Sequence, residues 1–203
     1  MDFWFEFAST YSYLSAMRIE QEAVRRGVAV RWRPFLLGPI FSSQGWNTSP
    51  FAIYPAKGRY MWRDVERRAA RLGLSFRRPS ADDPRTFPQH SVLAARMALC
   101  ALEEPWGVQF CREVFSAEFV DGRDISDRAT LESLAGRFVA SPRLVERALS
   151  PENKERLRRN VEEAAMRGLF GAPSFTVGDE LFWGDDRLED ALDWATANAT
   201  RCA

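Results

Sequence analysis

The sequence predicts an α/β protein whose small sheet is built from both ends of the chain and is interrupted by a large helical segment. Three observations predict this fold class: a βαβ pattern over residues 2–34, helical patterns from about residue 55 to residue 168, and a hairpin followed by a helix over residues 174–194. The chain has 203 residues, of which 46% are hydrophobic and 13% aromatic, so it can bury a substantial core.

Two strand patterns flank a helical pattern near the start of the chain. Residues 2–8 are aromatic on both faces apart from Glu6, as expected for a strand that is covered on two sides. Residues 28–34 alternate apolar side chains with polar or small ones, which is typical of a half-exposed strand. Together with the helix between them, these strands predict a βαβ unit.

The helix of this unit is predicted over residues 11–26. Leu14, Met17 and Val24 recur at helical spacing and predict its apolar face. Gly27 stands just past the helix end, where a left-handed conformation is common and glycine adopts it most easily. We therefore expect one continuous helix that ends at Gly27.

The middle of the chain has two parts. Residues 37–54 are rich in Gly, Ser, Asn and Pro, which predicts a long irregular connection of the kind that often carries function. Everything after it, to about residue 168, has helical patterns. The predicted helices cover residues 57–72, 90–103 and 105–119, and three more begin at the capping residues Ser126, Ser141 and Ser150.

The last part of the chain returns to strand patterns. Residues 174–177 and 180–183 are apolar runs on either side of a Gly-Asp turn, which indicates a hairpin. Asp185 or Asp186 is then predicted to cap a final helix. The order βαβ, helices, ββα is that of the thioredoxin topology with a helical insertion in the middle.

This order implies two domains. The strands of both ends must share one sheet, because neither end alone has enough strands to bury their apolar faces. Residues 1–40 and 169–203 would therefore form a discontinuous thioredoxin-like domain, and residues 41–168 would form the connecting loop and an all-helical insertion domain.

Charge and hydropathy exclude several function classes. The 28 basic and 28 acidic side chains give a formal net charge of zero, so we expect no nucleic-acid partner. No run of about eighteen apolar residues occurs, so we expect no membrane span. The first residues lack both the basic start and the apolar stretch of a secretory signal, so we expect a cytoplasmic protein.

The cysteines and the lone histidine do not form a metal or redox motif in the sequence. Cys100, Cys111 and Cys202 show no C-x-x-C or metal-type spacing, and the first two lie in apolar surroundings, where free thiols behave as small hydrophobes. His90 has no cysteine or clustered carboxylate partner, so we expect a structural role and no metal site.

The turn at residues 9–12 occupies the place where a thioredoxin-like fold carries its redox C-x-x-C motif. Ser9 and Ser12 replace the two thiols, so disulfide exchange is excluded. The start of the following helix would still favour an anion, such as the thiolate of a bound ligand. The alternative is that Ser9 or Thr10 is an ordinary helix cap.

Two further features are predicted to face the same cleft. Pro173 directly precedes a strand, where this topology commonly has a cis proline that leaves the backbone of Ala172 free to pair with a peptide-like ligand. The alternative is a plain proline at a strand start. Asp185 and Asp186 could hold an α-ammonium group, although carboxylates at a helix start are most often caps.

Several motifs resemble those of the 2-hydroxychromene-2-carboxylate isomerases. These are glutathione-dependent relatives of the kappa-class glutathione transferases within the DsbA-like thioredoxin superfamily. The similarity lies in residues 5–14, 170–175 and 182–187, and residues 45–50 with 54–61 are similar to a matching segment of bacterial members. The resemblance implies the DsbA-like fold with its helical insertion.

The resemblance also implies a function. It implies a glutathione-dependent cis–trans isomerase that interconverts 2-hydroxychromene-2-carboxylate and trans-o-hydroxybenzylidenepyruvate, or a close analogue. The substrate would be a small aromatic carboxylate and the assembly a homodimer. The positions that the resemblance assigns to the glutathione site are Ser9, Asn47, Lys57, Ala172, Pro173, Asp185 and Asp186.

The resemblance implies a different role for each of these positions. Ser9 would contact and activate the glutathione sulfur. Ala172, before Pro173, would bind the cysteinyl backbone, and the two aspartates would receive the γ-glutamyl end. Asn47 and Lys57 match polar positions that line the site, although Lys57 could equally be a surface lysine.

One departure from the family leaves alternatives open. The family turn usually reads Ser-Pro-Tyr, and Thr10 stands here in place of the proline, which affects the rigidity of the turn and the preferred substrate. One alternative is a kappa-type glutathione transferase that conjugates an electrophile. Another is a non-catalytic thioredoxin-like protein that binds extended peptides at the Ala172–Pro173 edge.

Overall fold

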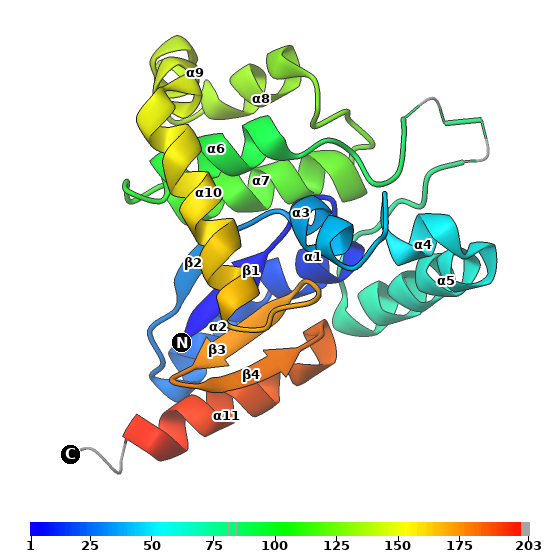
Figure 1. Ribbon diagram of the computed structural model, residues 1–203, viewed down its shortest axis with the longest axis vertical. Coiled ribbons are helices and arrows are strands. Elements are labelled where there is room, and N and C mark those ends of the chain that lie inside the picture. The colour runs from blue at the N-terminus through cyan, green and yellow to red at the C-terminus, as the bar shows by residue number, and fades with distance from the viewer. Residues whose placement is uncertain (81, 84, 200–203) are drawn as a thin grey trace.

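A four-stranded sheet lies at the centre of the molecule, with helices on both of its faces (Figure 1). The computed structural model describes residues 1–80, 82–83 and 85–199. The strand order is β2-β1-β3-β4, so the two strands from the start of the chain lie beside the two strands from its end. The predicted fold class, a thioredoxin-like sheet with a helical insertion, is therefore confirmed.

The strands pair as the predicted topology requires. The first strand runs parallel to the second and antiparallel to the third, which forms the hairpin with the fourth. The strands are β1 (Asp2–Phe5), β2 (Arg31–Pro34), β3 (Ser174–Val177) and β4 (Glu180–Trp183). The register sets Phe3 against Phe175, and their rings stack with centroids 5.5 Å apart. This aromatic face belongs to the main hydrophobic core.

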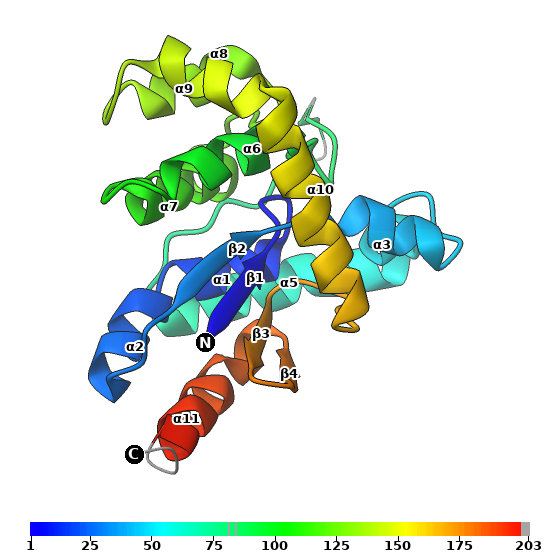
Figure 2. The ribbon, with the colours of Figure 1, turned by 60° about the vertical axis from the view of Figure 1, so that its left-hand side comes forward.

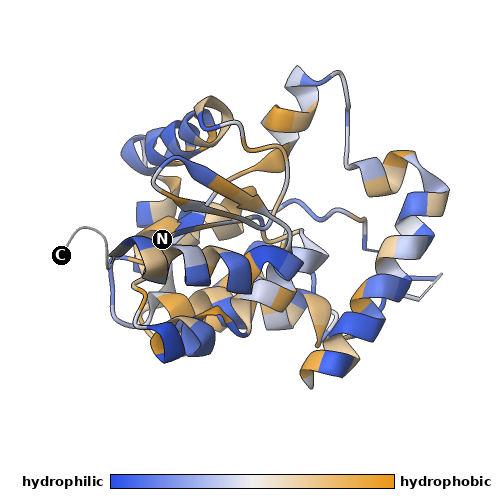
Figure 3. Ribbon diagram, turned by 90° about the horizontal axis from the view of Figure 1, so that it is seen from below, coloured by the Kyte–Doolittle hydropathy of each residue, from blue (hydrophilic) through white to orange (hydrophobic). Residues whose placement is uncertain are grey.

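The other face of the sheet has a smaller core around Trp4 and Phe35. It is covered by α3 (Leu37–Ser43) and α10 (Pro151–Met166), which lie together on one side of the sheet in Figure 2. Figure 3 shows hydrophilic and hydrophobic residues alternating along the helices, as expected when one side of each helix packs inward. Both faces of β1 are thus buried, as its aromatic sequence predicts.

The prediction of a single helix over residues 11–26 is wrong. The chain forms α1 (Thr10–Ala16) and α2 (Ile19–Arg26), and the break falls at Arg18, whose φ of −125° is not helical. The Arg18 side chain there donates hydrogen bonds to Glu189 and to a backbone oxygen of the distant loop after β4. This tertiary contact accompanies a break that no local signal predicts.

The break also corrects the predicted apolar face. Leu14 is fully buried and Met17 is partly buried against the core, but Val24 is 79% exposed. The interruption changes the direction of the second helix, so spacing counted from the first helix no longer identifies its buried side. Gly27 ends α2 in the left-handed conformation, with φ 65°, as predicted.

The expected irregular connection over residues 37–54 is partly helical. It contains α3 and the single turn α4 (Pro50–Ile53). The first backbone N–H of α3, on Leu37, donates to the Glu6 carboxylate at 3.0 Å, so a residue far back in the sequence supplies the cap. Ser49 caps α4 by accepting from the Phe51 N–H at 3.2 Å.

The helical block is otherwise as predicted, with shifted starts. Its remaining helices are α5 (Pro55–Leu72), α6 (Val92–Ala101), α7 (Gly107–Phe119), α8 (Arg128–Ala135) and α9 (Ser141–Leu149). Ser150 caps α10 as predicted, through the Asn153 N–H. Asp127 rather than Ser126 caps α8, and Ala140 is the residue before α9.

The end of the chain differs from the prediction at one point. A short 3-10 turn, η1 (Asp185–Arg187), precedes α11 (Leu188–Ala199), and Gly184 is the N-cap of η1. Among the described residues, neither aspartate side chain accepts a hydrogen bond from a backbone N–H of α11. Gly184 has φ 110°, and a Cβ atom there would lie 2.5 Å from Asp186 Oδ1. The prediction that an aspartate caps the final helix is therefore wrong, which leaves both carboxylates available for other contacts.

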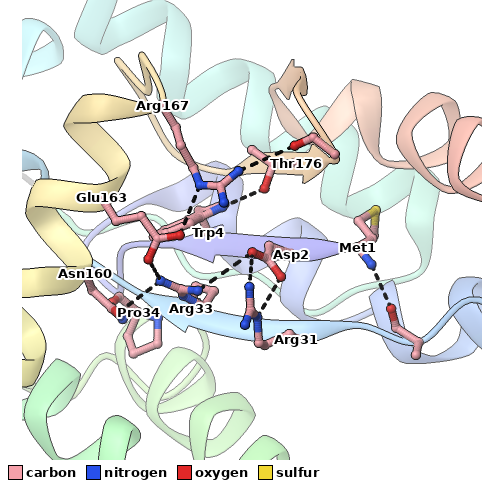
Figure 4. A network of polar contacts seen from close by, with 12 residues as sticks. Met1, Asp2, Trp4, Arg31, Arg33, Pro34, Asn160, Glu163, Arg167 and Thr176 are labelled. Atoms are coloured by element: carbon pink, nitrogen blue, oxygen red, sulfur yellow. Dashed lines mark hydrogen bonds and ion pairs between the residues drawn. The ribbon is translucent and has the colours of Figure 1, made fainter.

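A polar network fastens the sheet to α10 (Figure 4). Arg33 of β2 lies over the Trp4 ring, 4.2 Å from its centroid, and pairs with Asp2 and Glu163. Asn160 of α10 donates to the Pro34 carbonyl at 3.0 Å. Because these groups are mostly buried and bond to one another, the network holds α10 against the outer strand.

Two of the three cysteines lie in the described part of the chain, and both are buried free thiols. Burial raises the pKa of Cys100 and of Cys111, which keeps them protonated and unreactive. Cys202 lies outside the described residues. Across the residues that the structure describes, no cluster of His, Cys, Asp or Glu is arranged to hold a metal ion, and no helix is long and apolar enough to cross a membrane.

Candidate active site

Ser9 stands at the junction of β1 and α1. Its Oγ accepts a hydrogen bond from the Ser12 N–H at 3.1 Å, so it is the N-cap of α1. The same hydroxyl donates to the backbone oxygen of Ala172 at 2.9 Å. Ser9 is therefore both a helix cap and a bridge to the loop before β3, and the structure brings the first two predicted site elements together.

The Ala172–Pro173 peptide bond is cis, as predicted. Part of the expectation for Ala172 is wrong, because its carbonyl already accepts the Ser9 hydroxyl. Its N–H makes no hydrogen bond within the described residues. A carbonyl oxygen has two lone pairs, so this edge retains one donor and one acceptor position for a peptide-like ligand.

Close packing fixes the loop that carries the cis bond. A Cβ atom on Gly171 would lie 2.3 Å from the indole nitrogen of Trp183, so the loop can approach β4 only with glycine there. The Pro173 carbonyl accepts from the Gly184 N–H at 3.0 Å, which joins this loop to the residues before η1. The half-exposed rings of Trp183 and Phe170 pack together, with centroids 4.8 Å apart, at its edge.

Asp185 is held in a buried ion pair. Its side chain is 2% exposed, and its Oδ2 accepts from Arg68 of α5 through Nε at 3.0 Å and Nη2 at 2.7 Å. Its Oδ1 has no hydrogen-bond partner among the residues described. Burial raises the pKa of Asp185 to about 6, although Arg68 opposes the shift.

Asp186 has a different environment. Its side chain is 49% exposed and pairs with the equally exposed Arg187 at 3.1 Å. The two adjacent aspartates therefore differ in hydration and in partner, since only Asp185 reaches into the protein. Of these two aspartates, Asp185 combines burial with an open oxygen, and it is the stronger candidate for holding a charged ligand group.

Tyr11 connects α1 to the helical block. Its hydroxyl donates to Asp64 Oδ2 of α5 at 3.0 Å, and its ring lies 6.3 Å from the ring of Phe51 in α4. Burial, together with the charge of Asp64, raises the pKa of Tyr11, so its phenol remains protonated. This pair fixes α5 beside the turn that carries Ser9.

Helix α5 carries three polar side chains on one side. Lys57, Asp64 and Arg68 lie within about 40° of one another around the helix axis, because seven and four residues both correspond to nearly whole turns. Asp64 and Arg68 contact Tyr11 and Asp185, so this side of the helix faces the site.

Lys57 and Asn47 stay predictions as site residues. Lys57 is exposed, with its ammonium group 5.2 Å from the centroid of the Tyr54 ring, and Asn47 is exposed between α3 and α4. In the described part of the chain, no hydrogen bond or ion pair joins either one to Ser9, Ala172 or Asp185.

Glu6 is a residue whose role the sequence reasoning missed. Its buried carboxylate accepts from the Ser91 hydroxyl at the start of α6 and from the Leu37 N–H at the start of α3. Its backbone oxygen accepts from the Ser9 N–H at 3.0 Å. Burial raises the pKa of Glu6, and these hydrogen bonds oppose the shift. The signal was present, because Glu6 is the one charged residue within an aromatic run.

A family model and the sequences of curated proteins both match this chain over most of its length. The model of the DSBA-like thioredoxin domain matches residues 1–193. A 2-hydroxychromene-2-carboxylate isomerase of Sphingobium xenophagum is 29% identical over 193 residues, which cover 93% of this chain and 94% of that protein. Glutathione S-transferase kappa 2 of Caenorhabditis elegans is 26% identical over 206 residues, which cover 95% of this chain and 89% of that protein.

A solved structure has the same fold. The structure of a 2-hydroxychromene-2-carboxylate isomerase superposes with a TM-score of 0.82 and 24% sequence identity. The match covers 98% of this chain and 95% of the other. The similarity thus extends over the sheet, the helical block and the final helix together.

Proposed function

This chain belongs to the family of DsbA-like thioredoxin domains, and on that premise we propose that it is a glutathione-dependent isomerase of the 2-hydroxychromene-2-carboxylate type. The observation that best supports this proposal is the 2.9 Å hydrogen bond from the Ser9 hydroxyl to the backbone oxygen of Ala172. It joins a hydroxyl, at the place of the redox cysteine, to a backbone edge suited to a peptide. The names of the isomerase and kappa-class relatives support the enzyme class and the tripeptide.

The open groups of the site fit the parts of glutathione. The unpartnered Oδ1 of Asp185 can accept from the α-ammonium group of the γ-glutamyl end. The N–H and C=O of Ala172 can pair with the backbone of the cysteinyl residue. Lys57 would supply positive charge for one of the two carboxylates of glutathione, because it lies on the side of α5 that faces the site.

Bound glutathione supplies a thiolate nucleophile that can add reversibly to a conjugated carbon, which permits rotation about a former double bond without net consumption of the thiol. The role of the protein is to bind glutathione and to polarise its thiol. When glutathione is bound, the single Ser9 hydroxyl proton would turn from the Ala172 carbonyl to the sulfur and so favour the thiolate.

The aromatic side chains around the site suit a small aromatic carboxylate. Phe170 and Trp183 offer half-exposed rings beside the loop with the cis bond, and Tyr54 offers another beside Lys57. Such rings stack on a flat substrate and exclude water from the reacting carbon. We also propose a homodimer, as the resemblance implies.

A kappa-type transferase is the second candidate, and the kappa-class relatives of Caenorhabditis elegans favour it. The two enzymes differ in the fate of the thiol, because a transferase forms a stable conjugate and an isomerase releases the thiol. A binding protein for extended peptides is the third reading, and it requires no reaction.

One pair of measurements separates these functions. Isothermal titration with reduced glutathione should show binding in the micromolar to millimolar range, and incubation with 2-hydroxychromene-2-carboxylate should convert it while the glutathione concentration stays constant. Stoichiometric loss of glutathione would identify a transferase. Absence of glutathione binding at millimolar concentration would overturn both enzyme assignments.

A further inference from the structure

The Asp185 carboxylate is held along one edge only. Arg68 directs both Nε, at 3.0 Å, and Nη2, at 2.7 Å, to the same oxygen, Oδ2. The other oxygen has no hydrogen bond within the described residues, although the side chain is 2% exposed. Among the described residues, Glu118 Oε2 is an unpartnered oxygen sealed from solvent, but Asp185 Oδ1 is not, so a ligand group can reach Asp185 Oδ1 and complete its hydrogen bonding.

The charges around Asp185 show which group maintains its ionisation. Burial disfavours the charged form, and the pKa of Asp185 accordingly rises to about 6. Arg68 from α5 is the strongest opposing influence, Arg18 before α2 is weaker, and neighbouring Asp186 adds to the rise. The negative charge of Asp185 in turn contributes to the raised pKa of Tyr11, whose phenol stays protonated.

Arg18 cannot take over the role of Arg68. Its guanidinium donates to the backbone oxygen of Asp185 and pairs with Glu189, so it fixes the loop and not the carboxylate. The loop position and the orientation of the carboxylate thus depend on two different arginines. This separation allows the effect of Arg68 on the carboxylate to be tested without removing the anchor of the loop.

We propose that Arg68 is a positioning residue that keeps Asp185 ionised and turns its open oxygen toward the α-ammonium group of a γ-glutamyl ligand. This inference rests on the proposed glutathione function. Arg68 itself does not touch the ligand in this scheme, because its donors are directed to the far oxygen of the carboxylate.

The test compares binding of reduced glutathione by the protein and its Arg68→Met, Arg68→Lys and Arg63→Met variants, by calorimetry between about pH 5 and pH 9. Arg63 lies on the same helix, and within the part of the chain that the structure describes its exposed side chain pairs only with Glu66, so it is a matched control. Arg68→Met should raise the Kd at neutral pH about tenfold and move the pH midpoint of binding upward by about one unit or more. Arg68→Lys should recover part of both effects, and Arg63→Met should change neither.

A second ligand distinguishes positioning from general damage to the site. N-acetylcysteinylglycine keeps the thiol and the amide N–H but has no ammonium group. Its affinity should be the same for the protein and for Arg68→Met, because the interaction with Asp185 is absent in both. Near-UV circular dichroism of each variant checks that the fold is retained.

The possible results of these binding measurements lead to different conclusions about Arg68. If Arg68→Met binds glutathione with the unaltered Kd and pH midpoint, the role of Arg68 is overturned while the glutathione function stands. If Arg68→Met weakens both ligands equally, its role is structural and the inference also falls. If the unaltered protein does not bind glutathione at all, the proposed function fails together with the inference.

Discussion

The carboxylates at the two sides of the sheet are satisfied in different ways. Asp2 accepts from Arg31 at both of its oxygens, at 2.8 and 2.6 Å, and Glu163 accepts from Arg33 at one oxygen and from Arg167 at the other (Figure 4). Asp185 is more deeply buried than either, yet Arg68 occupies only one of its oxygens.

The pKa values follow this contrast. Although burial works against ionisation of Glu163, its two arginine partners lower its pKa. The pKa of Asp185 is instead raised to about 6 by burial that one arginine does not offset. A carboxylate with both oxygens paired, such as Asp2 or Glu163, contributes to the stability of the fold, whereas a buried carboxylate with one open oxygen retains binding capacity at a cost in stability. The comparison therefore supports the proposal that Asp185 binds a ligand group, and it favours a structural role for the network around Arg33.

The largest expected effect comes from removing the open carboxylate oxygen. Asp185→Asn should raise the Kd for glutathione about thirtyfold or more, since truncating one partner of a buried charged pair costs about 2 kcal/mol or more. Asp2→Asn is the matched change in the complete network, and it should lower the unfolding free energy without changing the Kd. Calorimetry and chemical denaturation of both variants measure these quantities. Equal effects on Kd would remove the distinction between the two regions.

The next effect is expected on turnover, when Ser9 is replaced by alanine. Ser9→Ala removes both the bond to Ala172 and the donor proposed for the sulfur, so turnover should fall by about tenfold to a hundredfold. Stability should fall by about 1 kcal/mol, the usual cost of a lost cap. The thiolate absorbance of bound glutathione against pH is the decisive measurement. Superimposable curves for the two proteins would reduce Ser9 to a helix cap.

Local patterns predicted much of the fold. The hairpin and the left-handed Gly27 depend on residues close in sequence, and both predictions are correct. The cis bond before Pro173 is also predicted correctly, but from the thioredoxin topology. The resemblance drawn from three short motifs is likewise confirmed by the family match over residues 1–193. The hairpin and the conformation of Gly27 can be predicted from the sequence because their physical causes lie within a few residues.

The features that were missed depend on distant partners. Arg18 interrupts a helical pattern where it reaches Glu189, and α3 starts where Glu6, 31 residues earlier, provides its cap. The ion pair of Arg68 and Asp185 joins positions 117 residues apart. No periodicity or spacing contains such contacts, so the sequence could propose Asp185 as a ligand group but could not identify the arginine that pairs with it.

A smaller effect is expected in the pH dependence of stability. The pKa of Asp185 in the folded protein, about 6, lies above its ordinary value of 3.8, so protonation favours the folded state. This contribution is fully present below about pH 4 and is lost as the pH rises through about 6, with a total of up to about 3 kcal/mol. Glutathione binding should depend on pH in the opposite direction, since it needs the ionised form.

Denaturation of the protein and of Asp185→Asn across this pH range measures the contribution as the difference between the two curves. Other buried acids such as Glu6 affect both proteins alike and cancel in that difference. Parallel curves for the two proteins would show that Asp185 titrates at its ordinary pKa, and the contrast with Glu163 would then disappear.

The smallest expected effect is on activity when all three cysteines are replaced. Cys100 and Cys111 are buried among apolar side chains, and their raised pKa values leave almost no thiolate at neutral pH. A variant with Cys100, Cys111 and Cys202 changed to alanine should therefore keep its turnover within about twofold, while losing about 1–2 kcal/mol of stability to the small cavities created. Turnover is compared at a temperature where circular dichroism shows both proteins folded. Loss of turnover in the folded variant would place a protein thiol in the reaction, and the contrast between a closed structural interior and an open site at Ser9 and Asp185 would no longer hold.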